Sequence, residues 1–174
     1  STAGEMALRM LLANASGMSL NQFAEVYLFK PLGVTNYTWT HHLYGRDDVP
    51  ARVELTSRDL AKLGQLYLDG GIWRGKRIVS ESWVSRSTAV HTRTNERNLG
   101  NPNYGYLWWR HSFAVDGEVF DGFQAQGAGG QFLFVFPELE VVAVFTSRNY
   151  GRRRQVNPLR VMREDLLAGM ERAE

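Results

Sequence analysis

The stretch "QAQGAGGQFLFVFPELEVVAVFT", residues 124–146, decides the fold, because it places glycines directly before the most apolar run of the chain. Gly127, Gly129 and Gly130 make the backbone most permissive where the pattern predicts a rigid hairpin. Glycine allows a positive φ or the close approach of another group. That group is either a neighbouring strand, as in a tight strand entry or bulge, or a substrate. Residue pattern alone leaves both interpretations open.

The apolar run predicts two strands, 131–136 and 141–147, joined by a turn at "PELE". In the first, Phe132, Phe134 and Phe136 share one face, while Leu133 and Val135 make the other face apolar as well. A strand that is apolar on both faces is typical of a sheet covered on both sides. The aromatic segment "YGYLWWRH", 104–111, predicts a third strand.

Start and stop signals predict helices in the first half of the chain and at its end. Ser19 with Gln22, and Thr56 with Asp59, have capping-box spacing. The first expected helix is capped by Thr2 with Glu5, contains the apolar stretch 6–13 and ends at Gly17, and the second, capped by Ser19, is stopped by Pro31 and Gly33. The third, capped by Thr56, has the stripe Leu60, Leu63, Gly64 and Tyr67 and ends at Gly70 and Gly71. A short helix capped by Ser80 and a final amphipathic helix opened by Asn157 and Pro158, with Leu159, Met162, Leu166 and Met170, complete the set.

Together these patterns predict an α+β fold, in which an antiparallel sheet of three C-terminal strands is covered by helices on both faces. The final helix is expected on one face and first-half helices on the other. No internal repeat or linker divides the sequence, so we expect residues 1–174 to form a single domain.

Composition excludes several classes of function. The net charge of the 174 residues is +2, which gives no field suited to nucleic acid or an anionic membrane. The chain has no cysteine, and its apolar runs are too short to span a membrane. The basic run Arg152, Arg153 and Arg154 is expected to be a solvated loop.

Few residues carry a chemical pattern of their own. His41 and His42 are adjacent and diverge in any regular element, and Asp47 and Asp48 complete no known ligand spacing, so no metal site and no cofactor are predicted. The single histidines His91 and His111 are expected to be surface or hydrogen-bonded core residues. Trp108 and Trp109 are expected to face the two sides of the sheet rather than to stack on a ligand.

A resemblance becomes visible when longer blocks are read in order. These are "STAGEMALRMLLANASGMSLNQFAEVYLFKPLGVTNYTW", "LTSRDLAKLGQLYLDGGIWRGKRIVSESWV", "YGYLWW" and "QGAGGQFLFVFPELEVVAVFT". Their order closely resembles the C-terminal part of the serine β-lactamase-like family. This family includes class C β-lactamases, penicillin-binding D,D-peptidases, and related esterases and amide hydrolases. The resemblance covers residues 1 to about 147.

The resemblance implies a cleft formed by short motifs. Ser-x-x-Lys, whose serine is acylated, does not occur in this chain. A second motif commonly reads "YSN-x-G" or "YST-x-G", and the opening "STAG" would place Ser1 and Thr2 at its end, in a catalytic position. The third, Lys/His-x-Gly, corresponds to "AQGAGGQ", where Gln124 or Gln126 stands in place of the cation.

The implied substrate-binding residues are Gln124, Gln126, Gly127, Gly129, Gly130 and Gln131. Glutamine hydrogen-bonds but does not attract a carboxylate, so the resemblance favours a neutral ester or amide over a penicillin. A substrate acyl group would lie along the glycine strand, and backbone N–H groups would form half of an oxyanion hole.

The resemblance thus implies an acyl-enzyme serine hydrolase whose nucleophile lies upstream, so we expect this chain alone to be inactive. An open sheet edge would then pair with the N-terminal segment or drive dimerisation. The partners implied are a small ester, amide or β-lactam, with no nucleic acid and no membrane span, and many relatives act outside the cytoplasm. Two alternatives remain: a β-lactam- or peptide-binding sensor without turnover, and an interaction domain whose glycine loop is structural.

Overall fold

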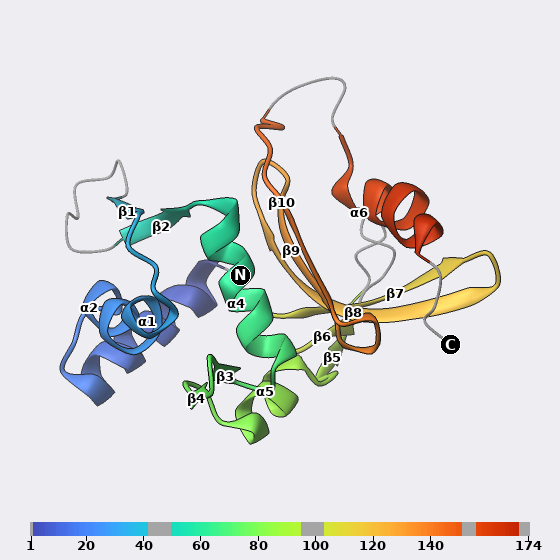
Figure 1. Cartoon of the computed structure of the whole chain (residues 1–174). Helices are drawn as coiled ribbons and strands as arrows, with labels where there is room; N and C mark the ends of the chain where they lie inside the picture. The colour runs from blue at the N-terminus through green and yellow to red at the C-terminus, as the bar shows by residue number, and fades with distance from the viewer. Residues whose placement is uncertain (1, 42–49, 95–102, 151–155, 171–174) are drawn as a thin grey trace. The chain divides into compact units, whose positions relative to one another are not determined.

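The computed structural model describes residues 2–41, 50–94, 103–150 and 156–170 (Figure 1). They belong to two compact units, Ser1–Asp59 and Leu60–Glu174, which are taken in turn. The expectation of one domain over 1–174 stays a prediction.

The first two helices of the first unit begin at or next to the residues predicted to cap them. Helix α1 (Thr2–Ser16) ends at Gly17, whose φ of 67° is left-handed. Helix α2 (Leu20–Ala24) begins with a capping box, in which the Gln22 amide donates to Ser19 Oγ at 3.3 Å and the Ser19 amide donates to Gln22 Oε1 at 3.0 Å. Both orphan N–H groups are thereby satisfied.

The helix predicted to stop at Pro31 and Gly33 continues past Pro31 and ends at Gly33. The chain continues from α2 through a π-helical turn, η1 (Glu25–Phe29), into α3 (Lys30–Leu32). Pro31 lies within this continuous helical segment, and the helix ends at Gly33, whose φ of 64° is left-handed. The π-helical turn rotates the apolar face, so Tyr27 is exposed while Phe29 is buried.

The first unit also holds a hairpin that the sequence did not predict, formed by β1 (Tyr37–His41) and β2 (Pro50–Leu55). Helix α4 (Ser57–Leu68) follows it. The Asp59 amide donates to Thr56 Oγ1 at 3.1 Å, and the Thr56 hydroxyl donates to Asp59 Oδ2 at 2.7 Å, so this predicted cap is confirmed.

The second unit is organised around an antiparallel sheet of six strands rather than the expected three, in the order β10-β9-β8-β7-β6-β5 (Figure 1). Its strands are β5 (Thr92–Arg93), β6 (Asn103–Tyr104), β7 (Trp109–Val115), β8 (Glu118–Gly127), β9 (Gln131–Phe136) and β10 (Val141–Phe145). Two smaller elements precede this sheet in the chain. They are a hairpin of β3 (Ile72–Trp73) and β4 (Lys76–Arg77), and helix α5 (Glu81–Thr88), which is capped by Ser80 as predicted.

The predicted strand 104–111 is in fact two strands. The Gly105 amide donates to the Trp108 carbonyl at 2.7 Å, and Leu107 has a φ of 64°, so the chain reverses between β6 and β7. β7 then turns at Asp116 and Gly117, with φ 49° and 88°, into β8. Two successive positive φ values in a two-residue loop form the hairpin turn that an Asp-Gly pair favours.

One face of the sheet packs against α4, as the sequence predicted for a first-half helix. Leu60, Leu63 and Tyr67 contact a cluster that contains Trp108, Phe123, Leu133 and Val135. Gly64 allows α4 to approach β10 closely, since a Cβ at this position would lie 2.5 Å from Val142 Cγ1.

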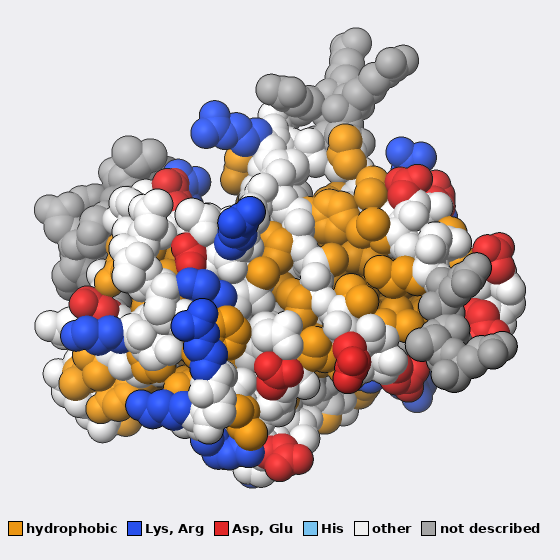
Figure 2. Space-filling model, viewed as in Figure 1, with side chains coloured by type: hydrophobic (Ala, Val, Ile, Leu, Met, Phe, Trp, Pro, Cys, Tyr) orange, Lys and Arg blue, Asp and Glu red, His pale blue; other side chains and the backbone are white. Residues whose placement is uncertain are grey.

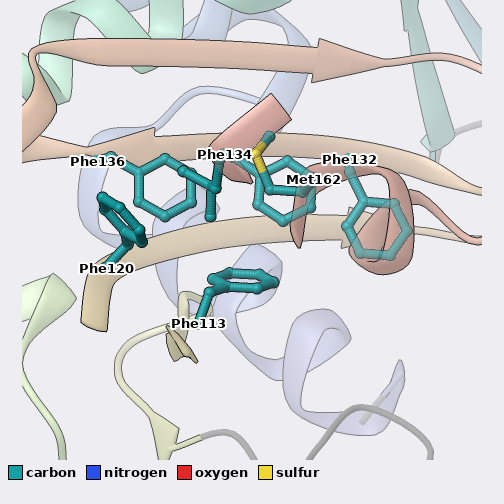
Figure 3. Packing of buried hydrophobic residues seen from close by; sticks show 7 residues of the cluster. Phe113, Phe120, Phe132, Phe134, Phe136 and Met162 are labelled. Atoms are coloured by element: carbon teal, nitrogen blue, oxygen red, sulfur yellow. The ribbon is translucent and has the colours of Figure 1, made fainter. Parts of the chain in front are cut away.

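The opposite face carries an aromatic cluster (Figure 3), made of Phe113, Phe120, Phe132, Phe134, Phe136, Met162 and Leu167. Met162 and Leu167 come from the C-terminal helix, which runs as α6 (Pro158–Val161), η4 (Met162–Leu166) and η5 (Leu167–Gly169). Figure 2 shows hydrophobic side chains gathered between the β9–β10 hairpin and α6. The prediction of helices on both faces of the sheet is therefore confirmed.

The C-terminal helix begins where the sequence predicted. The Leu159 amide donates to Asn157 Oδ1 at 3.0 Å, and Pro158 occupies the first turn. Leu166, expected to point inward, is exposed, and Leu167 is buried instead. The π-helical turn η4 shifts the inward face by about one residue, which explains this correction.

The described residues lack a strand beyond β10 and a helix that could span a membrane. No described strand pairs with the outer side of β10, which leaves one edge of the sheet open. No described helix has the length and hydrophobicity that crossing a membrane requires.

Candidate active site

The last residues of β8 project beyond β7. The β7–β8 ladder ends at the pair Trp109–Gln124, whereas the β8–β9 ladder continues to the pair Gly127–Gln131. Residues 125–127 therefore pair with β9 on one side, and no described strand pairs with them on the other. An extended ligand can add to such a free edge through main-chain hydrogen bonds.

The turn that follows, Ala128–Gly130, owes its glycines to two separate constraints. Gly129 and Gly130 have φ values of 81° and 85°, which side chains rarely adopt. A Cβ at Gly129 would lie 2.7 Å from Tyr150 Cε2, and one at Gly130 would lie 2.8 Å from Asn149 Nδ2. The glycine turn is thus packed against the chain that follows β10.

This packing segment, Ser147–Tyr150, is here called the strap. The Ser147 hydroxyl lies 2.6 Å from the Gly129 carbonyl and 3.2 Å from that of Gly130. The Asn149 amide donates to the Gly129 carbonyl at 3.0 Å. The Tyr150 hydroxyl donates to the Ala128 carbonyl at 3.1 Å, and Gln131 Nε2 donates to the Ser147 carbonyl. The carbonyls of Ala128 and Gly129 are therefore bound by the strap, and the Gly130 carbonyl shares the single Ser147 hydroxyl proton.

The N–H groups of the same turn, unlike its carbonyls, are not hydrogen-bonded within the described residues. Within the described residues, the amides of Ala128, Gly129 and Gly130 have no hydrogen-bond acceptor. Successive N–H groups in left-handed or turn conformations form a concave site for a carbonyl oxygen or an anion. The turn can thus offer donors to a ligand while its acceptors are occupied.

The glutamines before the turn lie on the face of the sheet that carries the aromatic cluster. Gln124 stands opposite Trp109 and Phe134, its side chain is 0% exposed, and neither amide atom has a partner among the described residues. Gln126 Nε2 is buried and also unpaired, although the residue as a whole is partly exposed. Buried polar atoms without partners are rare and costly.

His111 lies on the same face, opposite Gly122, and its ring stacks on Phe113 with centroids 4.4 Å apart. Its Nδ1 is buried without a partner in the described part of the chain. Burial lowers the pKa of His111, because the protonated ring loses its hydration.

Several other sequence predictions can now be placed. Trp108 is buried on the α4 face, and Trp109 packs against Tyr104 with ring centroids 4.6 Å apart, as expected of strand residues that face opposite sides. His91 Nε2 donates a hydrogen bond to the Arg86 carbonyl at 2.7 Å, and the residue is exposed, which agrees with a surface histidine.

Other predictions concern residues or side chains that the structure does not describe. Ser1 lies outside the described residues, and Thr2 begins α1 in the first unit with a side chain that is not described. His42, Asp47, Asp48 and Arg152–Arg154 also lie outside, as does the side chain of His41. The described residues contain no group of His, Cys, Asp and Glu suited to a metal ion.

Sequence reasoning missed the strap and the strand β8. The strand had one usable signal, the Asp116-Gly117 pair between apolar-containing segments. The strap had none, since a polar segment after a strand normally predicts a loop.

With this geometry established, the chain was compared with known proteins. A family model described as Beta-lactamase matches residues 1–165. The chain belongs to the beta-lactamase family. The resemblance that the sequence suggested is thereby confirmed.

A named relative of this beta-lactamase-family chain is the 6-aminohexanoate-dimer hydrolase of Paenarthrobacter ureafaciens, 32% identical over 98 residues that make up 53% of this chain. The chain spans 24% of that relative's length.

Solved structures show the same fold. A Bacillus anthracis protein with a provisional designation as a 6-aminohexanoate-dimer hydrolase has a TM-score of 0.63 at 24% identity, over 82% of this chain and 36% of its own. A penicillin-binding protein homologue from Caulobacter crescentus has a TM-score of 0.60 at 14% identity, over 80% of this chain and 49% of its own. At these identities the similarity establishes the fold alone.

Proposed function

We propose that the protein to which this beta-lactamase-family chain belongs is a serine hydrolase that forms an acyl-enzyme on an ester or amide, and that the end of β8 and the glycine turn bind the acyl group. The observation that carries the proposal is the hydrogen bonding of the glycine turn, Ala128–Gly130. Its carbonyls are bound by the strap, whereas its N–H groups lack acceptors among the described residues.

In this proposal each part of the site has one role. The acyl portion of the substrate extends along Ala125–Gly127, where β8 has no described partner on one side. The N–H groups of Gly129 and Gly130 supply half of the donors that stabilise the negative charge developing on the substrate oxygen. The serine nucleophile is supplied by a Ser-x-x-Lys motif, which residues 1–174 do not contain. Ser1 and Thr2 remain the proposed end of the second motif.

The structure favours Gln126 over Gln124 as the residue that contacts substrate. Gln124 is paired on both sides and 0% exposed, so it lies within the sheet. Gln126 lies in the projecting part of β8 and is partly exposed. Because its amide carries no charge, the proposed substrate group at this point is a neutral ester or amide. The name of the Paenarthrobacter relative, 6-aminohexanoate-dimer hydrolase, is consistent with a hydrolase.

The test uses the full-length protein, a fluorophosphonate probe and a panel of p-nitrophenyl esters with and without a carboxylate. We expect one serine within Ser-x-x-Lys to be labelled, and the neutral esters to be hydrolysed faster than the charged ones. Gln126→Lys should reverse that preference, with Gln65→Lys in α4 as a control that adds the same charge elsewhere, since the Gln65 amide bonds, among the described residues, only to Asp69 at the surface. Labelling of a serine within residues 1–174, or no labelling at all, would refute the proposal.

If the protein is instead a sensor module, the same p-nitrophenyl esters should release product with a different time course. A sensor accumulates a stable acyl-enzyme and releases no further product after one turnover, whereas a hydrolase releases product continuously. A single burst of p-nitrophenol equal to the protein concentration would favour the sensor.

The open edge of β10 is the proposed contact for a further strand, either from the remainder of the protein or from a second copy. An unpaired edge presents a row of free backbone groups and is a site of strand addition. Sedimentation of residues 1–174 alone is expected to show dimers or larger species, and a stable monomer over a wide concentration range would contradict this contact.

A further inference from the structure

We propose that the strap, Ser147–Tyr150, is a positioning element that sets the direction of the N–H groups of Gly129 and Gly130. This inference rests on the proposed function, in which those groups contact the substrate oxygen. The strap residues themselves do not contact the substrate in this scheme, so they are positioning residues.

The argument begins with the geometry of the peptide bond. In a planar trans peptide, the carbonyl of one residue and the N–H of the next lie in one plane and point in opposite directions. The described residues contain no cis peptide. Fixing the carbonyl of one turn residue therefore fixes the N–H direction of the residue after it.

The strap binds the carbonyls of Ala128 and Gly129, the residues that directly precede the two N–H groups. The Tyr150 hydroxyl donates to the Ala128 carbonyl at 3.1 Å, which orients the N–H of Gly129. The Asn149 amide at 3.0 Å and the Ser147 hydroxyl at 2.6 Å both bind the Gly129 carbonyl, which orients the N–H of Gly130. Both N–H groups consequently point away from the strap, on the side where no described acceptor lies.

The turn needs such support because glycine is the least restrained residue. Two consecutive glycines at φ 81° and 85° retain many other backbone conformations of similar energy. An oxyanion site works only when its donors are oriented before the reaction. The strap supplies this restraint from residues that lie 17 to 22 positions along the chain.

The strap is itself held at both ends. Gln131 Nε2, from the first residue of β9, donates to the Ser147 carbonyl. Asn149 Nδ2 donates to the Val156 carbonyl at 2.8 Å, next to the cap of α6. Ser147 and Asn149 are half-buried, whereas Tyr150 is 58% exposed. Ser147 is thus the inner anchor, and Tyr150 is an outer contact that solvent can compete with.

The experiment compares Ser147→Ala, Ser147→Thr and Tyr150→Phe in the full-length protein, with Ser112→Ala as the control. The Ser112 hydroxyl also donates one side-chain hydrogen bond, to Asp121, but on an exposed part of β7. Amide order parameters from ¹⁵N relaxation report the mobility of Gly129 and Gly130, and kcat and KM are measured on a neutral ester.

We expect Ser147→Ala to lower the Gly130 order parameter from about 0.85 toward 0.6, and Tyr150→Phe to do so at Gly129. Loss of a whole oxyanion donor costs about 100-fold or more in kcat, so misdirecting one should cost about tenfold, with KM changed less than about threefold. Ser147→Thr retains the hydroxyl and should restore kcat, and Ser112→Ala should change nothing.

Two results would overturn the inference in a folded variant. Unchanged order parameters in Ser147→Ala and Tyr150→Phe would show that the strap does not restrain the turn. Mobile glycines with an unchanged kcat would show that restraint of the turn does not matter for the reaction. A wild-type protein that forms no acyl-enzyme would instead refute the proposed function, while the order parameters would still decide whether the strap holds the turn.

Discussion

Replacing Gly130 by alanine tests the contact between the glycine turn and the strap against a matched position. Gly117, in the turn between β7 and β8, has φ 88°, close to the 85° of Gly130, but a Cβ there meets nothing within 4 Å. At Gly130 the Cβ would overlap Ser147 Oγ and lie 2.8 Å from Asn149 Nδ2. The two substitutions therefore share the backbone strain and differ in the close approach.

The expected magnitudes follow from these two terms. Left-handed strain costs about 1–2 kcal/mol for a residue with a Cβ, and the less flexible unfolded chain offsets about 0.4–1 kcal/mol of it. Gly117→Ala should therefore lose about 1 kcal/mol in the free energy of unfolding. Gly130→Ala should also disrupt the bond of the single Ser147 hydroxyl proton, worth about 0.5–1.5 kcal/mol, and force a local shift. We expect it to be less stable than Gly117→Ala by about 1–3 kcal/mol.

The assay is urea unfolding followed by far-ultraviolet circular dichroism, with m-values compared between variants. A third protein, Gly130→Ala with Ser147→Ala, sharpens the result. Its missing hydroxyl relieves the overlap, so it should be at least as stable as Gly130→Ala alone, and the two effects should not add. A difference below about 0.5 kcal/mol between Gly130→Ala and Gly117→Ala, or additive effects in the double variant, would refute the reasoning.

Three further predictions concern other residues. Gln124→Met removes two buried amide atoms that have no described partner, so it should raise the free energy of unfolding by about 1–3 kcal/mol, and a loss of stability in urea would show that the amide is bound. Ser19→Ala removes the capping box of α2 and should lower stability by about 1 kcal/mol, whereas the exposed control Ser112→Ala should change it by less than about 0.5 kcal/mol. The lowered pKa of His111 means that the unfolded state binds more protons, so its contribution is fully present above the unfolded pKa of about 6.5 and is lost as pH falls through the folded pKa. His111→Gln should flatten that part of the stability–pH curve, and an unchanged curve would contradict the assignment.

Helix starts were predictable because each depends on residues a few positions apart. Ser19 with Gln22 and Thr56 with Asp59 form their caps within one turn, so their spacing alone indicates the hydrogen bonds. The two π-helical turns were not predictable, and they moved Tyr27 and Leu166 to the surface. A one-residue change in helix register leaves no periodic signal in a segment this short.

The strands were predicted best where both faces are apolar. Alternation separated Phe132, Phe134 and Phe136 from Leu133 and Val135 on two faces, and the structure packs the first set against the C-terminal helix and the second against α4. Strand β8 was missed because its polar residues interrupt the apolar pattern, although one of them, Gln124, is buried. The segment 104–111 was taken as one strand because its composition is aromatic throughout, and composition does not indicate a turn.

By itself, the sequence determined the caps, the two-faced strand β9, the glycine positions and the family, since all of these depend on local spacing or on the order of motifs. Only the tertiary structure decided what the glycines are close to. Ser147, Asn149 and Tyr150 reach the turn because β10 runs antiparallel to β9 and returns the chain to the end of the hairpin where Gly129 and Gly130 lie. Contacts between residues about 20 positions apart depend on that strand pairing, which no local pattern specifies.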